Sequence, residues 1–236
     1  MKTYIGVKMI SLKKNIFIGF ILLLALSGCK NEVTSPIIED NNISAIKDTI
    51  ENWSLGNKLL VFGLIDNITN EIYEYTTTTI DSIGIFNISL NNVIPSNLTS
   101  VREIQNLPIS YLTISNPNVK GALGELLIFN PDTSKPSWLA ACYSKIFLNN
   151  VGYFTIDYLY VEEDMDITGT FTGYGQVNGK NYTTIFQYDL HYKKGWNKIV
   201  ITLVERTENG NDINEKYIFN HYEDGESQWI YWFINI

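Results

Sequence analysis

Residues 182–222 read YTTIFQYDLHYKKGWNKIVITLVERTENGNDINEKYIFNHY, and three runs within them are rich in Ile, Thr, Tyr, Phe and Val. β-Branched and aromatic side chains are typical of strands, whereas Gly and Asn mark tight turns. The turn residues Lys193-Lys194-Gly195 and Asn209-Gly210 separate the three runs. The pattern therefore predicts consecutive antiparallel strands over Tyr182–Tyr192, Lys198–Arg206 and Ile213–Tyr222.

The same pattern continues on both sides of this stretch, and no stretch after residue 54 has a helical period with caps. A glycine-rich loop is expected over Gly173–Gly179, with a hairpin turn at its Asn-Gly pair. Alternating residues predict that one face of the 85–90 strand is buried. Further strands are predicted at Leu59–Ile65, Glu71–Thr79, Ile85–Leu90, Tyr111–Ser115, Leu123–Phe129, Phe154–Val161, Asp166–Thr172 and Gln228–Ile234.

These elements predict an all-β fold, an antiparallel β-sandwich, that follows an N-terminal signal helix and a flexible tether. The strands form either one unit or two small β domains, an N-terminal one over residues 55–135 and a C-terminal one over residues 136–236. The last strand, Trp229–Ile234, is apolar on both faces. It must therefore be covered on both sides, either by the protein's own core or by a partner.

The composition excludes several classes of protein. The chain has 236 residues, of which 45% are hydrophobic and 13% aromatic, and this is typical of a globular protein. Its formal net charge of -8 argues against nucleic acid as a partner, because phosphate contacts need clustered Lys and Arg. Two Cys are too few for a disulfide framework or a Cys-rich zinc site, and Cys142 is expected to be a small buried hydrophobe.

The N-terminus has the layout of a secretory signal. A lysine-containing stretch without acidic residues precedes the apolar run Ile16–Leu26, which is short for a permanent membrane span. The residues that follow, Leu26-Ser27-Gly28-Cys29, resemble the lipobox of bacterial lipoproteins. The alternative is an ordinary signal peptide or anchor with an incidental Cys. Either Met1 or Met9 is the start.

The lipobox resemblance implies that residues 1–28 are removed and that Cys29 is the lipid attachment site, carrying acyl chains such as palmitate. The membrane would then be a partner through this N-terminal anchor, and the location would be the bacterial cell envelope, the outer membrane if the organism has one. Loss of four lysines from the signal takes the net charge from -8 to -12, so the acyl chains and not a basic surface must hold the protein.

Residues 29–54 are expected to be the lipidated Cys and a flexible tether, because residues 30–45 lack periodicity and are rich in polar turn formers. A short helical turn is expected within residues 46–53.

Two segments resemble domains of uncharacterised bacterial envelope lipoproteins. Residues 61–95, with Gly84 before Ile85-Phe86-Asn87-Ile88-Ser89-Leu90, are similar to the carboxypeptidase-regulatory-like or transthyretin-like pattern. The resemblance implies that Gly84 relieves a turn and that Phe86 fills the core. The second segment comprises Tyr158–Thr170, Tyr188-Asp189-Leu190 and Lys193-Lys194-Gly195-Trp196-Asn197, and it resembles a Leu-x-Leu-Lys-Lys-Gly-Trp-Asn motif of lipoproteins of unknown function. There Gly195 would take a positive φ and Trp196 would pack across the sheet end, and neither resemblance implies a catalytic activity.

Motifs of hydrolase elbows, phosphate-binding loops and zinc-protease helices are absent, so no catalytic, cofactor-binding or metal-ligating residue is assigned and no cofactor is expected. His191 and His221 lie near strand ends and are interpreted as surface or core histidines, with a metal pair as the alternative. Glu162–Asp166 is interpreted as a solvated turn, with calcium binding as the alternative. The oxygen-rich segment Asn209–Glu215 is explained as a hairpin turn.

The sequence therefore favours a lipid-anchored envelope protein with a non-catalytic binding or structural role, acting on an envelope protein or a glycan. The alternative is a carbohydrate-binding surface lipoprotein, because Trp and Tyr faces stack on sugar rings; Trp196 and Trp138 are the candidate ligand contacts. A hydrolase is the third hypothesis, because paired carboxylates are made in space and leave no mark in the sequence.

Overall fold

The computed structural model describes residues 42–65, 72–91, 93–108, 110–130, 137–144, 151–152, 154–221 and 229–233. The expected signal peptide, Cys29 and residues 30–41 of the expected tether lie outside the described residues. Within the described part, no helix is long and apolar enough to cross a membrane.

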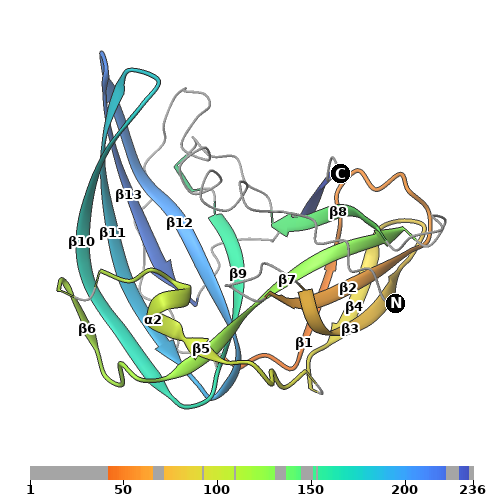
Figure 1. Ribbon diagram of the computed structural model, residues 1–236. Helices are drawn as coiled ribbons and strands as arrows, with labels where there is room; N and C mark the ends of the chain where they lie inside the picture. Colours follow the sequence, from red (N-terminus) through yellow and green to blue (C-terminus); the bar gives the residue numbers. More distant parts are fainter. Residues whose placement is uncertain are drawn as a thin grey trace, which may run out of the picture.

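The fold is all-β, as predicted, and its one helix in the described residues is the four-residue α2 (Val101–Ile104) (Figure 1). The sequence pattern located most of the strands to within a few residues at each end. The strands are β1 (Ala45–Thr49), β2 (Lys58–Ile65), β3 (Ile72–Ile80), β4 (Ile85–Ser89), β5 (Thr99–Ser100), β6 (Leu112–Ile114), β7 (Lys120–Asn130), β8 (Ser137–Ser144), β9 (Phe154–Val161), β10 (Met165–Val177), β11 (Lys180–Tyr192), β12 (Gly195–Asn209), β13 (Asp212–Asn220) and β14 (Trp229–Phe233).

One large sheet joins the two halves of the chain, and β1 with β4 forms a small second sheet. The path of the large sheet is β14-β8-β7-β9-β12-β13-β11-β10-β6. The long strand β7 is the junction, because it pairs with β9 at its N-terminal end and with both β2 and β8 further along. The expected boundary between residues 135 and 136 lies outside the described residues, but the pairing of β7 ties the strands of both halves together.

Two hydrophobic cores lie on opposite faces of the same strands. On β9, Ile156 and Tyr158 belong to the first core, whereas Leu159 and Val161 belong to the second. Side chains alternate between the two faces of a strand, so each strand between the cores contributes to both. The first core contains β1 and β4 with their buried residues, and it includes Phe86, as expected from the alternation in its strand.

The short helical turn expected within residues 46–53 is wrong. Residues 45–49 form β1, which pairs antiparallel with β4, and Ile46 and Ile50 are buried in the first core. The two isoleucines gain more from burial against β4 than the isolated segment could gain from one helical turn. The folded part of the chain therefore begins before residue 54, the predicted end of the tether.

The prediction of consecutive antiparallel pairing is correct for β12 with β13 but wrong for β11 with β12. β13 lies between the other two strands, antiparallel to β12 and parallel to β11. Packing explains this order, because Tyr217 stacks on Phe186 (ring centroids 6.0 Å apart) and Phe219 stacks on Tyr188 (4.5 Å) across the β11–β13 pair.

The hairpin between β10 and β11 turns at the Asn-Gly pair, as predicted. Asn178 and Gly179 have φ values of +49° and +77°, and two successive positive φ values define the type I′ turn. The expected glycine-rich loop before it is wrong, because Gly173 to Val177 continue β10 in register with β11.

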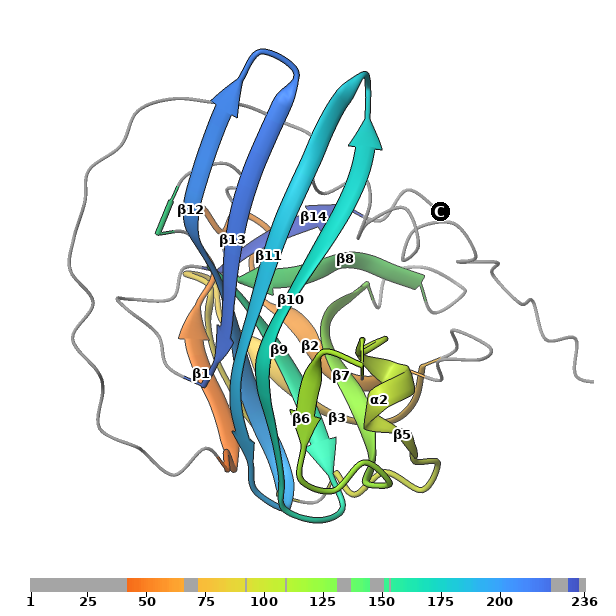
Figure 2. The same cartoon turned by 90° about the vertical axis from the view of Figure 1, so that its left-hand side faces the viewer.

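The four strands β10, β11, β12 and β13 rise side by side above the rest of the molecule (Figure 2). β12 pairs with β9 only up to Thr202, and β10 pairs with β6 only up to Gly169. We call the part of these four strands that extends beyond Thr202 of β12 and Gly169 of β10 the projecting sheet.

Candidate functional site

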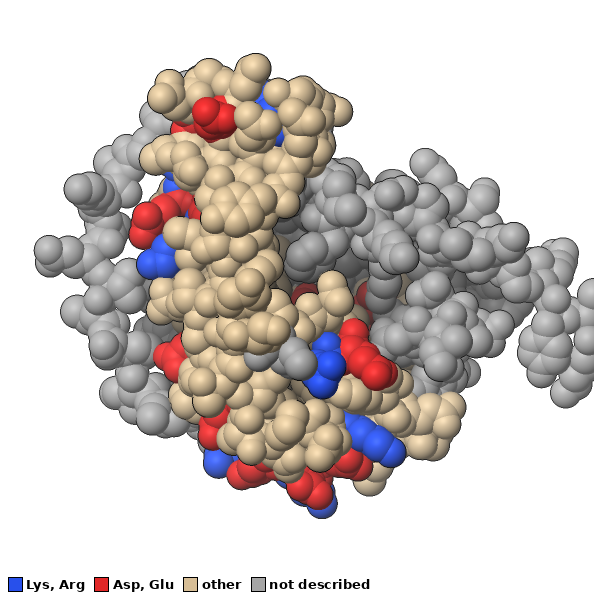
Figure 3. Space-filling view, turned by 60° about the vertical axis from the view of Figure 1, so that its left-hand side comes forward, with Lys and Arg blue, Asp and Glu red and all other residues tan. Residues whose placement is uncertain are grey.

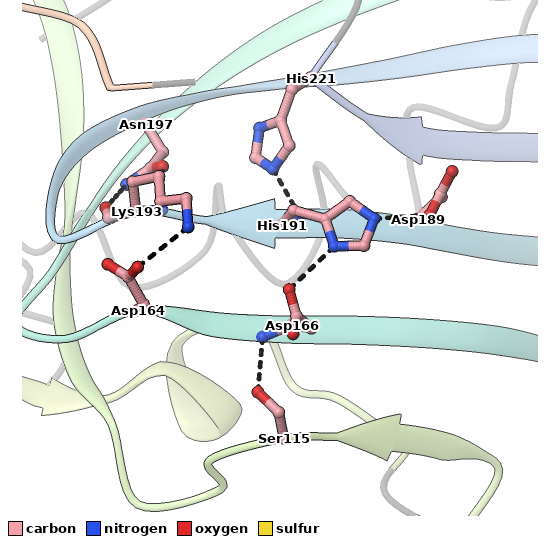
Figure 4. Close-up of polar contacts among 8 residues, drawn as sticks. All are labelled: Ser115, Asp164, Asp166, Asp189, His191, Lys193, Asn197 and His221. Atoms are coloured by element: carbon pink, nitrogen blue, oxygen red, sulfur yellow. Dashed lines mark hydrogen bonds and ion pairs between the residues drawn. The ribbon is translucent and has the colours of Figure 1, made fainter. Parts of the chain in front are cut away.

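β11 and β12 are joined by only two residues and yet diverge to admit β13, and His221 lies in the wedge where β13 ends (Figure 4). The main-chain N–H of His191 donates to His221 Nε2 (2.9 Å). On the other side, His221 Nδ1 lies 2.6 Å from the Lys198 carbonyl oxygen. The imidazole therefore bridges β11 and β12 where the main chain of β13 no longer does.

These two contacts define the tautomer of His221. Nε2 accepts a hydrogen bond and must be bare, so the proton of the neutral ring is on Nδ1, where it is donated to the Lys198 carbonyl. A second proton would point at the N–H of His191. Burial lowers the pKa of His221 below 6.5, and the Tyr192 ring packs edge-on against it at 5.2 Å. His221 is therefore a neutral structural group.

The side chain of His191 has the opposite environment. It is half exposed on β11, with Nδ1 2.8 Å from Asp166 Oδ1 on β10 and Nε2 3.2 Å from Asp189 Oδ1. The hydrogen bond to Asp166 is the main cause that raises the pKa of His191 above 6.5. Protonation gives each carboxylate an N–H donor, whereas the neutral ring can satisfy only one of them.

The Lys-Lys-Gly-Trp-Asn motif forms the corner between β11 and β12, and its residues are structural. Asn197 is fully buried and replaces a main-chain turn: its Oδ1 accepts from the Lys193 N–H (2.9 Å), and its Nδ2 donates to the carbonyls of Lys193 (2.7 Å) and Gly195 (2.9 Å). Gly195 has a φ of +109°, as expected. Asp164 accepts from the Lys194 N–H (2.8 Å) and from Lys193 Nζ (3.0 Å), and these bonds lower its pKa.

The start of the described chain is attached to this corner. Asn42 forms a bridge with Asn197, and its Nδ2 donates to the Lys194 carbonyl (2.7 Å). The N–H of Ile43 donates to the Trp196 carbonyl (2.8 Å). The chain therefore enters the fold at the end of β12 that is opposite the projecting sheet.

The acidic run Glu162–Asp166 forms the turn between β9 and β10, as interpreted, and it is hydrogen-bonded to the segment Ser115–Lys120 between β6 and β7. Glu162 Oε1 accepts from the Lys120 N–H (3.1 Å), and Glu163 Oε2 accepts from Asn116 Nδ2 (3.1 Å). The Asp166 N–H donates to Ser115 Oγ (2.8 Å). Among the described residues, no group of three His, Cys, Asp or Glu side chains is arranged to hold a metal ion. The calcium and His-pair alternatives gain no support.

Trp196, one of the two predicted ligand contacts, is buried in the first core. Only 4% of it is exposed; its indole N–H donates to the Val93 carbonyl (2.8 Å), and its ring packs edge-on against Phe62 (4.8 Å) and Tyr160 (5.6 Å). It packs at the sheet end in the first core, as the motif implied. The side chains of Trp138 and Cys142, like Cys29, lie outside the described residues.

A buried ion pair lies on the projecting sheet, and sequence reasoning missed it. Glu215 lies at the end of the oxygen-rich segment interpreted as a hairpin turn and within the predicted strand Ile213–Tyr222; it is only 2% exposed and pairs with Arg206 across the β12–β13 ladder. Tyr217 Oη also lies 3.3 Å from Glu215 Oε2. Burial raises the pKa of Glu215, and the neighbouring Arg206 opposes this rise. The register between β12 and β13 that places Glu215 opposite Arg206 depends on the bulge between Leu203 and Glu205, and the sequence does not show this bulge.

The side chains of His191 and His221 can hold a proton, but they do not have the geometry of a nucleophilic centre. Both ring nitrogens of His191 contact carboxylates, and both of His221 contact main-chain groups. A general base needs a ring nitrogen directed at the group it deprotonates. The arrangement instead links β10, β11 and β12 through two histidines of opposite protonation preference.

The two histidines should titrate on opposite sides of pH 6.5. A raised pKa means that His191 stabilises the fold fully below pH 6.5, and that this contribution is lost as the pH rises through its folded pKa. A lowered pKa means that His221 contributes fully above pH 6.5, and that this contribution is lost as the pH falls through its folded pKa. NMR titration of the imidazole Cε1–H signals checks this. Asp166→Asn should lower the pKa of His191 and leave His221 nearly unchanged; a common midpoint near 6.5 would contradict both assignments.

Comparison with protein-family models, with curated proteins and with solved structures gave no match.

Proposed function

We propose that this protein is a lipid-anchored component of the bacterial cell envelope with a non-catalytic binding or structural role. The observation that carries the proposal is the sequence Leu26-Ser27-Gly28-Cys29 directly after an apolar run, followed by a polar segment that leads into the fold. Cys29 would carry the acyl chains, and two or three chains hold a protein stably at a bilayer where one does not.

The geometry of the fold supports a tethered binding module. The chain enters at Asn42, on the corner where β12 begins, and the tip of the projecting sheet lies at the other end of β12. At about 3.3 Å per residue, a strand of this length separates its ends by up to about 45 Å. An anchor that precedes Asn42 would therefore leave the projecting sheet directed away from its attachment point.

The carbohydrate-binding alternative is weaker. It rested on Trp196 and Trp138, and Trp196 is in the core. The large aromatic side chains that are exposed among the described residues are Tyr111, which precedes β6, and Tyr174 on β10. A sugar-binding face needs several aromatic and polar groups that converge on one ligand, so the described residues give the carbohydrate-binding alternative little support.

Cys29→Ala should abolish acylation of the chain. Cells expressing the full chain are incubated with labelled palmitate, and the label on the purified protein is measured. Cys142→Ala is the matched control because it removes the other thiol of the chain, and it should keep the label. Label that persists on the Cys29→Ala protein, or that disappears from the Cys142→Ala protein, would exclude Cys29 as the attachment site.

A further inference from the structure

Along the projecting sheet, the described part of the chain leaves the outer edge of β10 without a paired strand. The N–H of Ser115 donates to the Asp166 carbonyl (3.1 Å), so the main-chain groups of Asp166 point away from β11. Alternation along the strand directs those of Thr170, Thr172, Tyr174 and Gln176 the same way. β6 ends its pairing at Gly169, and no described residue pairs with these four. Each presents an N–H and a carbonyl group ready to accept a further strand.

The two edges of the projecting sheet differ in their protection. The β12 edge has a bulge between Leu203 and Glu205, and it carries the charges of Glu205, Arg206 and Glu208. Figure 3 shows charged side chains along the β12 border and at the tip, and none along the β10 border. From Ile167 to Val177, β10 has no charge, no proline and no register shift against β11. Bulges and charges are what prevent strand addition, and only the β10 edge is without them.

The geometry points to a second copy of this chain as the strand that pairs with this edge. The open stretch is symmetric about Gly173, so a two-fold axis through Gly173 pairs Thr170 with Gln176 and Thr172 with Tyr174 of the other copy. Each of these pairs joins residues whose main-chain groups face outward, as an antiparallel hydrogen-bonded pair requires. The same patch serves both copies, which is the condition for a closed dimer.

The uncharged edge permits a second copy, and its shape favours one. The net charge of -8 on each copy opposes association, but no charged side chains of β10 would face each other from Ile167 to Val177. In this register Gly173 of one copy faces Gly173 of the other in a non-hydrogen-bonded pair, where facing side chains come closest, and it has no side chain to clash. Tyr174 is 81% exposed and would be covered by the partner strand. Two projecting sheets would then form one continuous sheet.

The test uses two double variants that differ by one residue. In the proposed register, position 172 of one copy faces position 174 of the other. Thr172→Lys with Tyr174→Lys places like charges opposite each other, whereas Thr172→Lys with Tyr174→Glu places opposite charges there. Thr207→Lys adds the same charge to the β12 edge as a control. Light scattering during gel filtration of the full chain in detergent gives the protein mass per particle over about a hundredfold range of concentration.

We expect two copies per particle for the wild type, for Thr207→Lys and for the Lys/Glu variant, and about tenfold weaker dimerisation or more for the Lys/Lys variant. Hydrogen exchange at the main-chain N–H groups of positions 172 and 174 should slow as the concentration rises in the wild type. The same groups should show no such slowing in the Lys/Lys variant. Circular dichroism verifies that both double variants are folded. A single wild-type copy at every concentration, or an unweakened Lys/Lys dimer, would overturn the proposal; loss of the Lys/Glu dimer would overturn the Gly173-centred register.

Discussion

Replacing Trp196 by Ala should reduce the free energy of unfolding by about 3–5 kcal/mol, the usual cost of truncating a buried large aromatic residue. The side chain is 4% exposed and packs edge-on against Phe62 and Tyr160. Truncation leaves a cavity in the first core and also an unpaired Val93 carbonyl. Urea unfolding followed by circular dichroism, with linear extrapolation to water, measures the loss.

Two further variants separate the contributions at this position. Trp196→Phe keeps an aromatic ring but removes the donor to Val93, so it should cost about 1–3 kcal/mol, the penalty for a buried unsatisfied group. Trp53→Ala is the matched control, because Trp53 is only half-buried and its indole N–H donates to the Gly56 carbonyl (2.8 Å). It should cost less than Trp196→Ala. A Trp196→Ala protein as stable as the wild type would contradict the core assignment.

Replacing Arg206 by Met should cost about 3–5 kcal/mol, because it leaves the carboxylate of Glu215 buried without its cation. The Glu215 side chain is 1% exposed and that of Arg206 is 10% exposed, so solvent cannot replace the lost partner. Replacing both residues, as Arg206→Met with Glu215→Leu, should recover most of the loss because no charge then remains buried. Unfolding in urea at neutral pH measures the free energy of unfolding of the wild type, of Arg206→Met and of the double variant.

The Arg206→Met variant should also become more stable as the pH falls. Burial already raises the pKa of Glu215, and loss of the guanidinium removes a cause that lowers it. A Glu with a raised folded pKa binds more protons in the folded state than in the unfolded state, so acidification between the folded and unfolded pKa values favours folding. Lys216→Met is the control; Lys216 lies 3.6 Å from the exposed Glu205, and such pairs contribute about 0–1 kcal/mol. Equal losses for Arg206→Met and Lys216→Met would contradict the buried-pair assignment.

The sequence predicted local structure well, because strands and turns leave local signals. β9 was predicted with its observed bounds, Phe154–Val161, and the Asn178-Gly179 turn and the buried face of β4 were also correct. Each of these depends on residues close together in the chain. The segment that became β1 was misjudged, because its strand forms only through contact with β4 some forty residues later.

The candidate site was only partly accessible from the sequence. His191 and His221 both end strands, but their contact spans thirty positions and depends on β13 lying parallel to β11. In the predicted meander, β12 would lie between β11 and β13, so His191 and His221 would not be on neighbouring strands. The structural nature of the Lys-Lys-Gly-Trp-Asn corner could be predicted, since Gly195 and Trp196 have typical local roles; the fully buried Asn197 and its hydrogen bonds could not.

Alternation, turn residues and composition by themselves determined that this chain is all-β and where most of its strands begin and end. Which strands are neighbours was decided only by the tertiary structure, because aromatic stacking between β11 and β13 and the junction at β7 join residues far apart in the chain. The same holds for the burial of Trp196 and Glu215, which the sequence did not determine: burial depends on what packs against a residue, and that is a property of the assembled sheet.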